Sequence, residues 1–452
     1  MNVTSSALLT DLYELTMGQA YLSEGMTGEA VFEFFVRKLP AHRNFFMAAG
    51  LQQVLDFLED FHFTAEELRW LERTGRFSSE FLDLLRTLRF SGQVHAMAEG
   101  TIFFPHEPIL RVTAPLIQAQ LIETRVMNLL NLQTMIASKA CRSMLVAQGR
   151  PLIDFGLRRA HGAEAGLLAA RAAYLAGFAG TSNVLAGALF DIPIYGTMAH
   201  SFIQAHEDEA SAFERFAHAQ PDNILLLIDT YDTEAAAAKV VALAPRLKAR
   251  GLRVHGVRLD SGDLADHARK VRRILDQGGL TEATILASGN LDEGRVQALV
   301  QDGAPIDSFA VGTAMTTSGD APSLDCAYKL QEYMGRPRRK RSEGKVTWPG
   351  RKQVYRRSGD DGRLLEDIIT VEGDVHTGEP LLIPVMDAGR RLGPSPTIED
   401  IRRRAMRSLA QLPDPLQRLD EAPPHDVRIA SALEELARTA NHHLSLLSKE
   451  TT

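Results

Sequence analysis

The sequence predicts an α/β fold: an irregular parallel α/β barrel in the central part and a second, discontinuous α/β sandwich domain. From about residue 116 to 330, strand-like apolar runs alternate with helical patterns every 25–35 residues or so, roughly as parallel βα units do. One run, NILLLID at residues 223–229, is continuously apolar, as expected of a strand buried on both faces. An open doubly wound sheet is the alternative arrangement of such units.

The expected barrel elements alternate regularly along the chain. Strands are expected at residues 151–155, 192–197, 223–229, 252–259, 284–288 and 308–313. The spacing of apolar residues predicts helices at 164–178, from 202, at 233–250, from 264 and at 292–302. Gly256, inside the run at 252–259, is expected to let a neighbouring segment pack closely against it.

The two flanks lack this regularity. The N-terminal flank shows a helix near 11–24, an alternating strand at 30–36 and a strand–turn region at 94–112. The C-terminal flank shows short strands such as 352–356 and helical patterns near 398–412 and 427–447. We expect residues 1–115 and 331–452 to combine into the sandwich domain, and residues 116–330 to form the barrel.

Composition excludes several classes of protein. The chain has 452 residues and a net charge of −7, so no general affinity for nucleic acid or anionic membranes is expected. No apolar run approaches the roughly 20 residues of a membrane-spanning helix, and the start lacks the pattern of a secretion signal. The two cysteines, Cys141 and Cys326, form neither a disulfide framework nor a CxxC metal motif. These features favour a cytoplasmic protein.

Polar turns follow the expected strands, and HGVRLDSGDL at residues 255–264 is the most informative of them. In parallel α/β folds, ligands bind beyond the carboxyl ends of the strands. Such turns recur along the chain, which indicates one shared cavity: DFGLRR (154–159), GTSN (180–183), GTMAHS (196–201), DTYD (229–232), RLDSGD (258–263), SGN (288–290) and GT (312–313).

The residue types in these turns point to an anionic ligand. Glycine and hydroxyl residues before a helix present backbone N–H groups that suit phosphate, as at Ser288-Gly289 and Gly312-Thr313. Helix capping is the alternative interpretation of those residues. Arg158 and Arg258 offer forked donors for phosphate or carboxylate, and the alternative for each is a structural salt bridge to Asp154 or Asp260.

His200 stands out among the 14 histidines because it follows a glycine-bearing strand end and precedes Ser201. Histidine in such a turn can serve as a base, a ligand or a phosphate acceptor. Zinc is not expected, because His200 and His206 lack the HExxH spacing. Asp260 and Asp263 can help to hold Mg²⁺, chiefly through substrate phosphates and water.

The ordered set of motifs closely resembles the nicotinate phosphoribosyltransferase family. The matching segments run in family order over nearly the whole chain, except for about the last 60 residues. They are LLTDLYELTMG (8–18), FGLRRAHG (155–162), GTSNVLAG (180–187), GTMAHSF (196–202), DTYDT (229–233), GVRLDSGDL (256–264), SGNLDE (288–293), VGT (311–313) and GKVTWPGRKQVYR (344–357).

The resemblance implies a reaction and its cofactors. Nicotinate and phosphoribosyl pyrophosphate give nicotinate mononucleotide and pyrophosphate, with Mg²⁺, and hydrolysis of the co-substrate ATP drives the step. By resemblance, His200 is the histidine that ATP phosphorylates, Arg258 meets the pyridine ring and its carboxylate, and Asp260 lies near the ribose or the metal. Ser201, beside His200, is counted among the substrate-binding residues.

The remaining roles also come from the resemblance. Phe155 is expected to line the pyridine slot and Arg158 to hold phosphate. The 5′-phosphate is expected to lie on Ser288, Gly289, Gly312 and Thr313. Tyr13 with Asp11 resembles an aromatic lid from a neighbouring subunit, which implies a homodimer with shared active sites.

Ser182 bears on the choice of substrate. Nicotinamide-using relatives carry an aspartate in the turn that here reads GTSN, and an aspartate there repels a carboxylate. Ser182 is therefore expected to favour the acid, and helix capping is its alternative role. Transfer to nicotinamide or quinolinate, or a non-catalytic phosphoribosyl-binding protein, are the competing interpretations of the chain.

Overall fold

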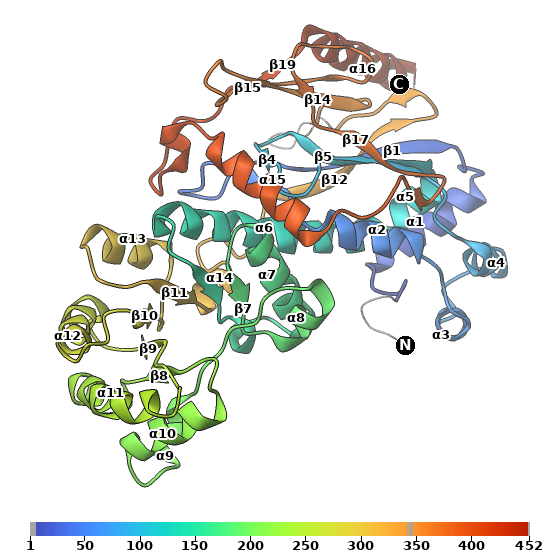
Figure 1. Ribbon diagram of the computed structural model, residues 1–452. Helices are drawn as coiled ribbons and strands as arrows, with labels where there is room; N and C mark the ends of the chain where they lie inside the picture. The colour runs from blue at the N-terminus through green and yellow to red at the C-terminus, as the bar shows by residue number, and fades with distance from the viewer. Residues whose placement is uncertain (1–5, 341, 343–346, 451–452) are drawn as a thin grey trace. The chain divides into compact units, whose positions relative to one another are not determined.

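A computed structural model of the protein describes residues 6–340, 342 and 347–450, which form two compact units (Figure 1). Lys139–Pro322 make up unit 2, and the described parts of Met1–Ser138 and Ser323–Thr452 make up unit 1. Residues 344–346 of the family-like motif at 344–357 lie outside the described residues. Among the described residues, no helix is both long and apolar enough to cross a membrane.

Unit 2 contains a six-stranded, fully parallel sheet with the order β7-β6-β11-β10-β9-β8. Strands β8 to β11 pair in sequence order, β6 pairs with β7, and the last strand, β11, pairs with the first, β6, as in a barrel. No ladder joins β7 to β8 among the described residues, so the barrel is irregular, as predicted. The strands are β6 (Leu152–Asp154), β7 (Gly180–Thr181), β8 (Leu225–Leu227), β9 (Gly256–Leu259), β10 (Thr284–Ala287) and β11 (Ser308–Val311).

Helices follow the strands, and α11, α12 and α13 lie on the outer side of β8–β11 (Figure 1). The N-caps of these three helices are Asp232, Asp263 and Asp292, whose carboxylates accept backbone N–H groups of the first turn. The helices of the unit are α7 (Ala163–Leu175), α8 (Val184–Phe190), α9 (His200–Gln204), α10 (Glu209–Ala219), α11 (Thr233–Lys248), α12 (Leu264–Gln277), α13 (Glu293–Gln301) and α14 (Thr313–Thr316), with a 3₁₀ turn at Leu157–Arg159.

Small and branched apolar side chains fill the space between the strands. Ile153, Leu286 and Ala310 form a buried cluster, and Phe155 and Leu225 pack against it. Gly256 is needed for close approach, because a Cβ there would lie 2.4 Å from the backbone oxygen of Thr284 on the next strand. The packing role predicted for Gly256 is confirmed.

Four predicted elements differ from the structure. The expected strand at 192–197 makes only a single bridge, between Thr181 and Ile194. Pro193 lacks an N–H for a longer ladder. Strands β8 and β9 are shorter than the strands predicted at 223–229 and 252–259. The expected helix at 427–447 begins as strand β19 (Val427–Ile429) and becomes helix α16 only at Ser431 (Ser431–Glu450).

Unit 1 combines strands from both ends of the chain, which confirms the discontinuous domain. Its seven-stranded antiparallel sheet has the order β13-β12-β1-β5-β3-β17-β18. Strands from the N-terminal flank form the middle of this sheet, flanked on either side by later strands. They are β1 (Glu29–Val36), β3 (Gln93–Ala96), β5 (Pro108–Pro115), β12 (Cys326–Tyr333), β13 (Arg336–Pro337), β17 (Ile383–Asp387) and β18 (Arg390–Arg391).

A second sheet of unit 1, with the order β16-β14-β15-β19, packs on the first through contacts that include a buried ion pair. Lys352 Nζ of β14 lies 2.7 Å from Glu33 Oε2 of β1, and Arg111 of β5 donates to the Lys352 carbonyl. The strands of this sheet are β14 (Lys352–Ser358), β15 (Leu364–Val371), β16 (Glu379–Pro380) and β19, and a small hairpin pairs β2 (Phe46–Met47) with β4 (Ile102–Phe103).

The units divide the chain at other positions than residues 115 and 330. One division falls inside the long helix α6, and β12 lies in the sheet of unit 1 because it pairs with β1. The remaining helices are α1 (Leu12–Ser23), α2 (Leu51–Glu59), α3 (Ala65–Arg73), α4 (Ser79–Thr87), α5 (Leu116–Leu121), α6 (Glu123–Ala147) and α15 (Ile398–Ala410), with a 3₁₀ turn at Asp414–Gln417.

Candidate active site

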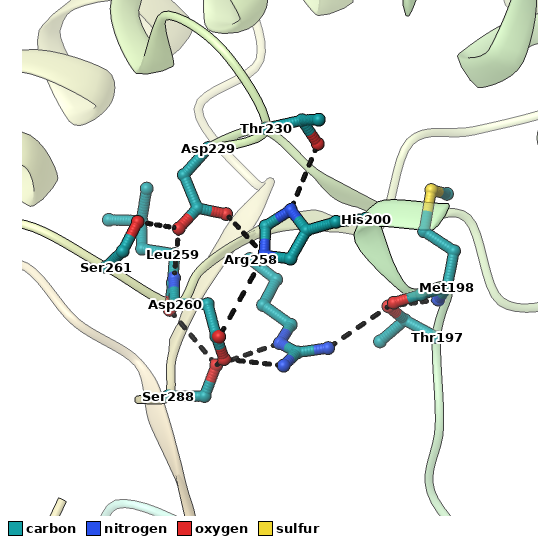
Figure 2. Close-up of polar contacts among 10 residues, drawn as sticks. All are labelled: Thr197, Met198, His200, Asp229, Thr230, Arg258, Leu259, Asp260, Ser261 and Ser288. Atoms are coloured by element: carbon teal, nitrogen blue, oxygen red, sulfur yellow. Dashed lines mark hydrogen bonds and ion pairs between the residues drawn. The ribbon is translucent and has the colours of Figure 1, made fainter. Parts of the chain in front are cut away.

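His200 lies at the start of α9, where its ring faces two carboxylates and a hydroxyl (Figure 2). Its Nε2 is 3.9 Å from Asp229 Oδ1 and 4.0 Å from Asp260 Oδ2, while its Nδ1 lies 3.1 Å from Thr230 Oγ1. The side chain is 39% exposed, so the imidazole is held by polar groups and still open to a ligand.

Arg258, on β9, is the central cation of this cluster. Its Nη2 lies 2.6 Å from Asp260 Oδ1, and its Nε donates to Ser288 Oγ at 2.8 Å. Its guanidinium carbon stands 5.3 Å from the centre of the Phe155 ring. The salt bridge considered as the alternative role is therefore present, and the same guanidinium also covers the aromatic face beside the predicted pyridine slot.

Asp260 is kept ionised by its neighbours. Partial burial raises the pKa of this carboxyl, but the hydrogen bond from Ser288 and the charge of Arg258 outweigh burial and lower it below its ordinary value. Residues 258 and 260 are two apart on a strand end, so their side chains share one face of the sheet. The structure thus brings His200, Arg258, Asp260 and Ser288 together.

Asp229 belongs to the same cluster, although the sequence analysis assigned it no role. Its Oδ2 accepts the Asp260 N–H at 2.9 Å and the hydroxyl of Ser261. Its side chain is 2% exposed, and its Oδ1, which faces His200, has no hydrogen-bond partner among the described residues. The position of Asp229 at the end of an apolar run was the available signal.

The two predicted phosphate turns have different geometries. Gly289 has φ of 92°, and a Cβ there would lie 1.8 Å from the Asp260 carbonyl oxygen. Gly312 precedes α14, which begins at the exposed Thr313. Ser288 does not cap a helix, since its hydroxyl contacts Asp260 and the Leu259 carbonyl. The capping alternative therefore fails for Ser288.

The turn at 180–183 is tied to the end of β6. The Ser182 N–H donates to the Asp154 carbonyl, and Thr181 Oγ1 donates to the Asp154 carboxylate at 2.7 Å. Asn183, not Ser182, caps α8. The Ser182 side chain makes no hydrogen bond with the described residues, so the capping alternative fails here as well.

Two predicted binding residues lie apart from these contacts. Arg158 is exposed and makes no ion pair or hydrogen bond with the described residues. Its predicted alternative, a salt bridge to Asp154, is absent because Asp154 accepts from Gly156 and Thr181 instead. The Ser201 side chain is likewise exposed and without a hydrogen bond inside the described part of the chain.

Asp11 and Tyr13 belong to unit 1, at the start of α1. Tyr13 is 44% exposed, and Asp11 accepts a hydrogen bond from Thr124 Oγ1 at 3.1 Å. Burial, followed by the charges of Glu123 and Glu14, raises the pKa of Tyr13 well above its usual range, so its phenol keeps its proton.

Metal ligands are sparse in this part of the protein. Within the residues that the structure describes, no group of three or more His, Cys, Asp or Glu side chains is arranged to hold a metal ion. Asp260 and Asp229 do offer two carboxylates near His200, and one of their oxygens is buried without a hydrogen bond. This donor set fits a Mg²⁺ ion that takes its other ligands from phosphates and water.

Comparison with known proteins gives a consistent result. Residues 8–131, 151–337 and 373–437 match the N-terminal domain, the family core and the C-terminal domain of nicotinate phosphoribosyltransferase. The nicotinate phosphoribosyltransferase pncB2 of Mycobacterium tuberculosis strain H37Rv is 50% identical over 416 residues, which are 92% of this chain and 89% of that protein. The chain belongs to the nicotinate phosphoribosyltransferase family.

Comparisons with two more distant family members support the same assignment. The nicotinate phosphoribosyltransferase of Bacillus subtilis is 41% identical over 360 residues, which cover 78% of this chain and 73% of that protein. The crystal structure of human nicotinic acid phosphoribosyltransferase superposes with a TM-score of 0.85 at 29% identity, covering 95% of this chain and 99% of the human one. The predicted family and fold are confirmed.

Proposed function

We propose that this chain, an enzyme of the nicotinate phosphoribosyltransferase type, converts nicotinate and phosphoribosyl pyrophosphate into nicotinate mononucleotide and pyrophosphate in NAD salvage. We further propose that the reaction is coupled to ATP hydrolysis through phosphorylation of His200. The observation that carries the proposal is the meeting of His200, Arg258 and Asp260 at the carboxyl ends of the barrel strands, in a chain of this family.

Arg258 and Phe155 supply a fitting site for an aromatic acid. Phe155 offers a ring face, and Arg258 above it is a permanently charged, forked donor whose side chain is only 12% exposed. A pyridine held there presents its carboxylate to the guanidinium. Ser182, in place of an acid, leaves the nearby turn without a charge that would repel that carboxylate.

The transfer step needs no general base. The pyridine nitrogen attacks the ribose C1 with its free lone pair, the bond from C1 to the pyrophosphate oxygen breaks, and pyrophosphate leaves with that electron pair. The protein's tasks are to position the two substrates and to stabilise charge on the leaving group. Asp229 and Asp260 would hold Mg²⁺, which supplies positive charge to the pyrophosphate.

The geometry around His200 supports its role as a phosphate acceptor. When Nδ1–H donates to Thr230 Oγ1, the lone pair of Nε2 is free and faces the site. Attack of Nε2 on the γ-phosphorus of ATP forms an N–P bond and releases ADP. The resulting phosphohistidine places negative charge beside the pyrophosphate site and biases the cycle towards product.

A homodimer with shared sites is part of the proposal. Helix α8, which directly follows Ser182, exposes a cluster of large apolar side chains, where unpartnered apolar surface is costly. The exposed residues are Val184, Leu185 and Leu189, with Ile194 and Tyr195 close by in the chain. A second copy covering this face would supply Asp11 and Tyr13 to the site. We place the enzyme in the cytoplasm, where thiols such as those of Cys141 and Cys326 stay reduced.

The deciding experiment measures pyrophosphate release from phosphoribosyl pyrophosphate with nicotinate, with and without ATP. We expect release with nicotinate, stimulated by ATP and accompanied by ADP formation. Nicotinamide and quinolinate serve as competing acceptors in the same assay. Preference for either of these, or binding of phosphoribosyl pyrophosphate without turnover of any pyridine, would overturn the proposed function.

A further inference from the structure

A buried network of charged side chains lies in unit 2, outside the cluster around His200. Lys139, on α6, places its Nζ 2.7 Å from Glu293 Oε2 and 2.7 Å from Asp320 Oδ1. Arg142, one turn further along α6, lies 3.1 Å from Glu293 through its Nε. The side chains of Lys139 and Glu293 are 5% and 8% exposed, so each charge depends on its charged partners to offset the loss of contact with water.

The two acids that Lys139 holds lie in the segments that follow the two phosphate turns. Glu293 is the first residue of α13, the helix that comes after the turn containing Ser288 and Gly289. Asp320 follows α14, the short helix that begins at the Gly312–Thr313 turn. One ammonium group therefore joins two segments that are not neighbours in the sequence.

Each turn has a glycine that packs closely against a neighbouring backbone segment. A Cβ at Gly289 would overlap the Asp260 carbonyl, and a Cβ at Gly312 would lie 3.2 Å from the Phe155 carbonyl oxygen. On the other side of α14, Ser318 adopts φ of 46° and donates from its hydroxyl to the Ala321 carbonyl at 2.8 Å, which shapes the turn that carries Asp320. We therefore expect a displacement at Asp320 or Glu293 to reach the turns.

We propose that Lys139 is a positioning residue that holds the Ser288–Gly289 and Gly312–Thr313 turns in register, and so sets the affinity for the 5′-phosphate of the substrate. The inference rests on the proposed function, because it takes these turns as the phosphate site. Lys139 itself touches no substrate. Its influence passes through Glu293 and Asp320.

The chemistry of the network predicts a selective effect. Removing the ammonium leaves two carboxylates near each other with one fewer cation, so the segments that carry them separate. The backbone N–H groups of the two turns then no longer converge on one phosphate. Among the described residues, Lys139 makes no hydrogen bond or ion pair with Arg258 or Phe155, so the nicotinate slot is expected to lose much less affinity than the phosphate site.

The experiment compares three full-length variants. Lys139→Met removes the charge and keeps most of the volume. The double variant Lys139→Met/Asp320→Asn also removes one acid, which restores the charge balance without the bridge. Lys239→Met is the matched control, because Lys239 pairs with the buried Glu209 at 2.9 Å between α10 and α11, away from both turns.

The readouts are the KM values for phosphoribosyl pyrophosphate and nicotinate, thermal unfolding, and calorimetric binding of ribose 5-phosphate and of inorganic pyrophosphate. For both Lys139 variants we expect the KM for phosphoribosyl pyrophosphate and the Kd for ribose 5-phosphate to rise about tenfold, as for other supporting residues behind a binding site. The KM for nicotinate and the Kd for pyrophosphate should stay within about twofold. Lys239→Met should change neither KM.

The outcomes separate the inference from the proposed function. A double variant that unfolds like the wild type and binds ribose 5-phosphate with unchanged affinity would overturn the role of Lys139. An equal loss of affinity for nicotinate and for ribose 5-phosphate would also overturn it, since a general structural role predicts that result. A wild-type chain that binds ribose 5-phosphate but forms no nicotinate mononucleotide would contradict the proposed function and leave the role of Lys139 in phosphate binding standing.

Discussion

Gly289 packs against the backbone of Asp260 so closely that a Cβ at position 289 would lie 1.8 Å from the Asp260 carbonyl oxygen. The turn after β10 and the end of β9 are therefore in direct backbone contact. The hydroxyl of Ser288 adds a hydrogen bond to the Asp260 carboxylate. The predicted ribose and 5′-phosphate sites are thus in direct contact with each other.

Gly289→Ala tests this contact. The added methyl must displace the backbone at Asp260 and also strain a residue at φ of 92°, so we expect a loss of about 3 kcal/mol in the free energy of unfolding. Denaturant titration measures it. Gly251→Ala is the control, because Gly251 has φ of 76° but nothing within 4 Å of its Cβ position, and should lose only about 1 kcal/mol. Equal losses for the two variants would contradict the contact.

His200→Ala tests the coupling to ATP. Without the imidazole no phosphohistidine forms, so the ratio of pyrophosphate release with and without ATP should fall to about one, while slow ATP-independent transfer persists. His206→Ala is the matched control, since His206 lies on the same short segment and bonds the Phe202 carbonyl. Stimulation by ATP that survives in His200→Ala, or equal loss of both activities, would argue against the assignment.

Glu14 predicts a pH dependence of stability. Burial raises the pKa of its carboxyl from 4.5 to about 7, despite hydrogen bonds from Thr10 and Thr124 that lower it. Between these values the folded state keeps a proton that the unfolded state releases. The stabilising contribution is therefore complete below about pH 4.5 and is lost as the pH rises through 7.

Glu14→Gln should remove that part of the pH dependence. The free energy of unfolding of the variant minus that of the wild type should rise between pH 5 and pH 8. Only the wild type is destabilised over this range, because only it has a buried carboxyl that ionises. Chemical denaturation at pH 5, 6, 7 and 8 gives the difference. A difference that is constant over this range would show that Glu14 does not titrate near neutrality.

Ser182→Asp tests the choice of substrate. A carboxylate in this turn would repel the nicotinate carboxylate, and like charges in contact cost several kcal/mol, so kcat/KM for nicotinate should fall at least about tenfold. Ser182→Asn is the neutral control of matched size and should lose much less. The prediction is checked by steady-state kinetics with nicotinate and nicotinamide, and unchanged kcat/KM for nicotinate in Ser182→Asp would refute it.

Shared active sites predict complementation between two defective subunits. In a homodimer of either variant, Tyr13→Ala or His200→Ala makes both sites defective. In a mixed dimer the two substitutions lie on different chains, so both fall in one site and the other site has the native Tyr13 and His200. After exchange of equal amounts, half the dimers are mixed and each has one intact site, so about a quarter of the ATP-stimulated rate should return. Leu185→Asp, on the exposed face of α8, should prevent this recovery. Sites built within one chain would show no recovery at all.

Much of this site could be predicted because parallel strands place their carboxyl ends at one edge. That rule brings Arg258 and Ser288 together, and His200 joins them from a segment that forms only a single bridge. The role of Asp229 was missed because an aspartate after a strand is usually a cap or a turn residue. Only the tertiary structure shows that its second oxygen faces His200.

Other features leave no local trace in the sequence. Lys139 sits in the middle of a long helix, and its partners lie 154 residues away or more, so no spacing rule connects them. The segment at 192–197 has the composition of a strand, but its neighbours decide that only Ile194 forms a bridge. Strand propensity permits a segment to form a strand, and its packing against neighbouring elements decides whether the strand forms.

The pairing of β1 with β12 has a consequence for synthesis of the protein. Phe34 lies opposite Tyr328 in this ladder, and the whole of unit 2 separates them in the chain. Unit 2 is therefore an insertion between two halves of one sheet. On the ribosome β1 emerges early, and the edge that pairs with β12 stays unpaired until β12 appears. Every strand of the barrel emerges before β12 does. The inserted unit can fold during translation, and its host is completed only near the end.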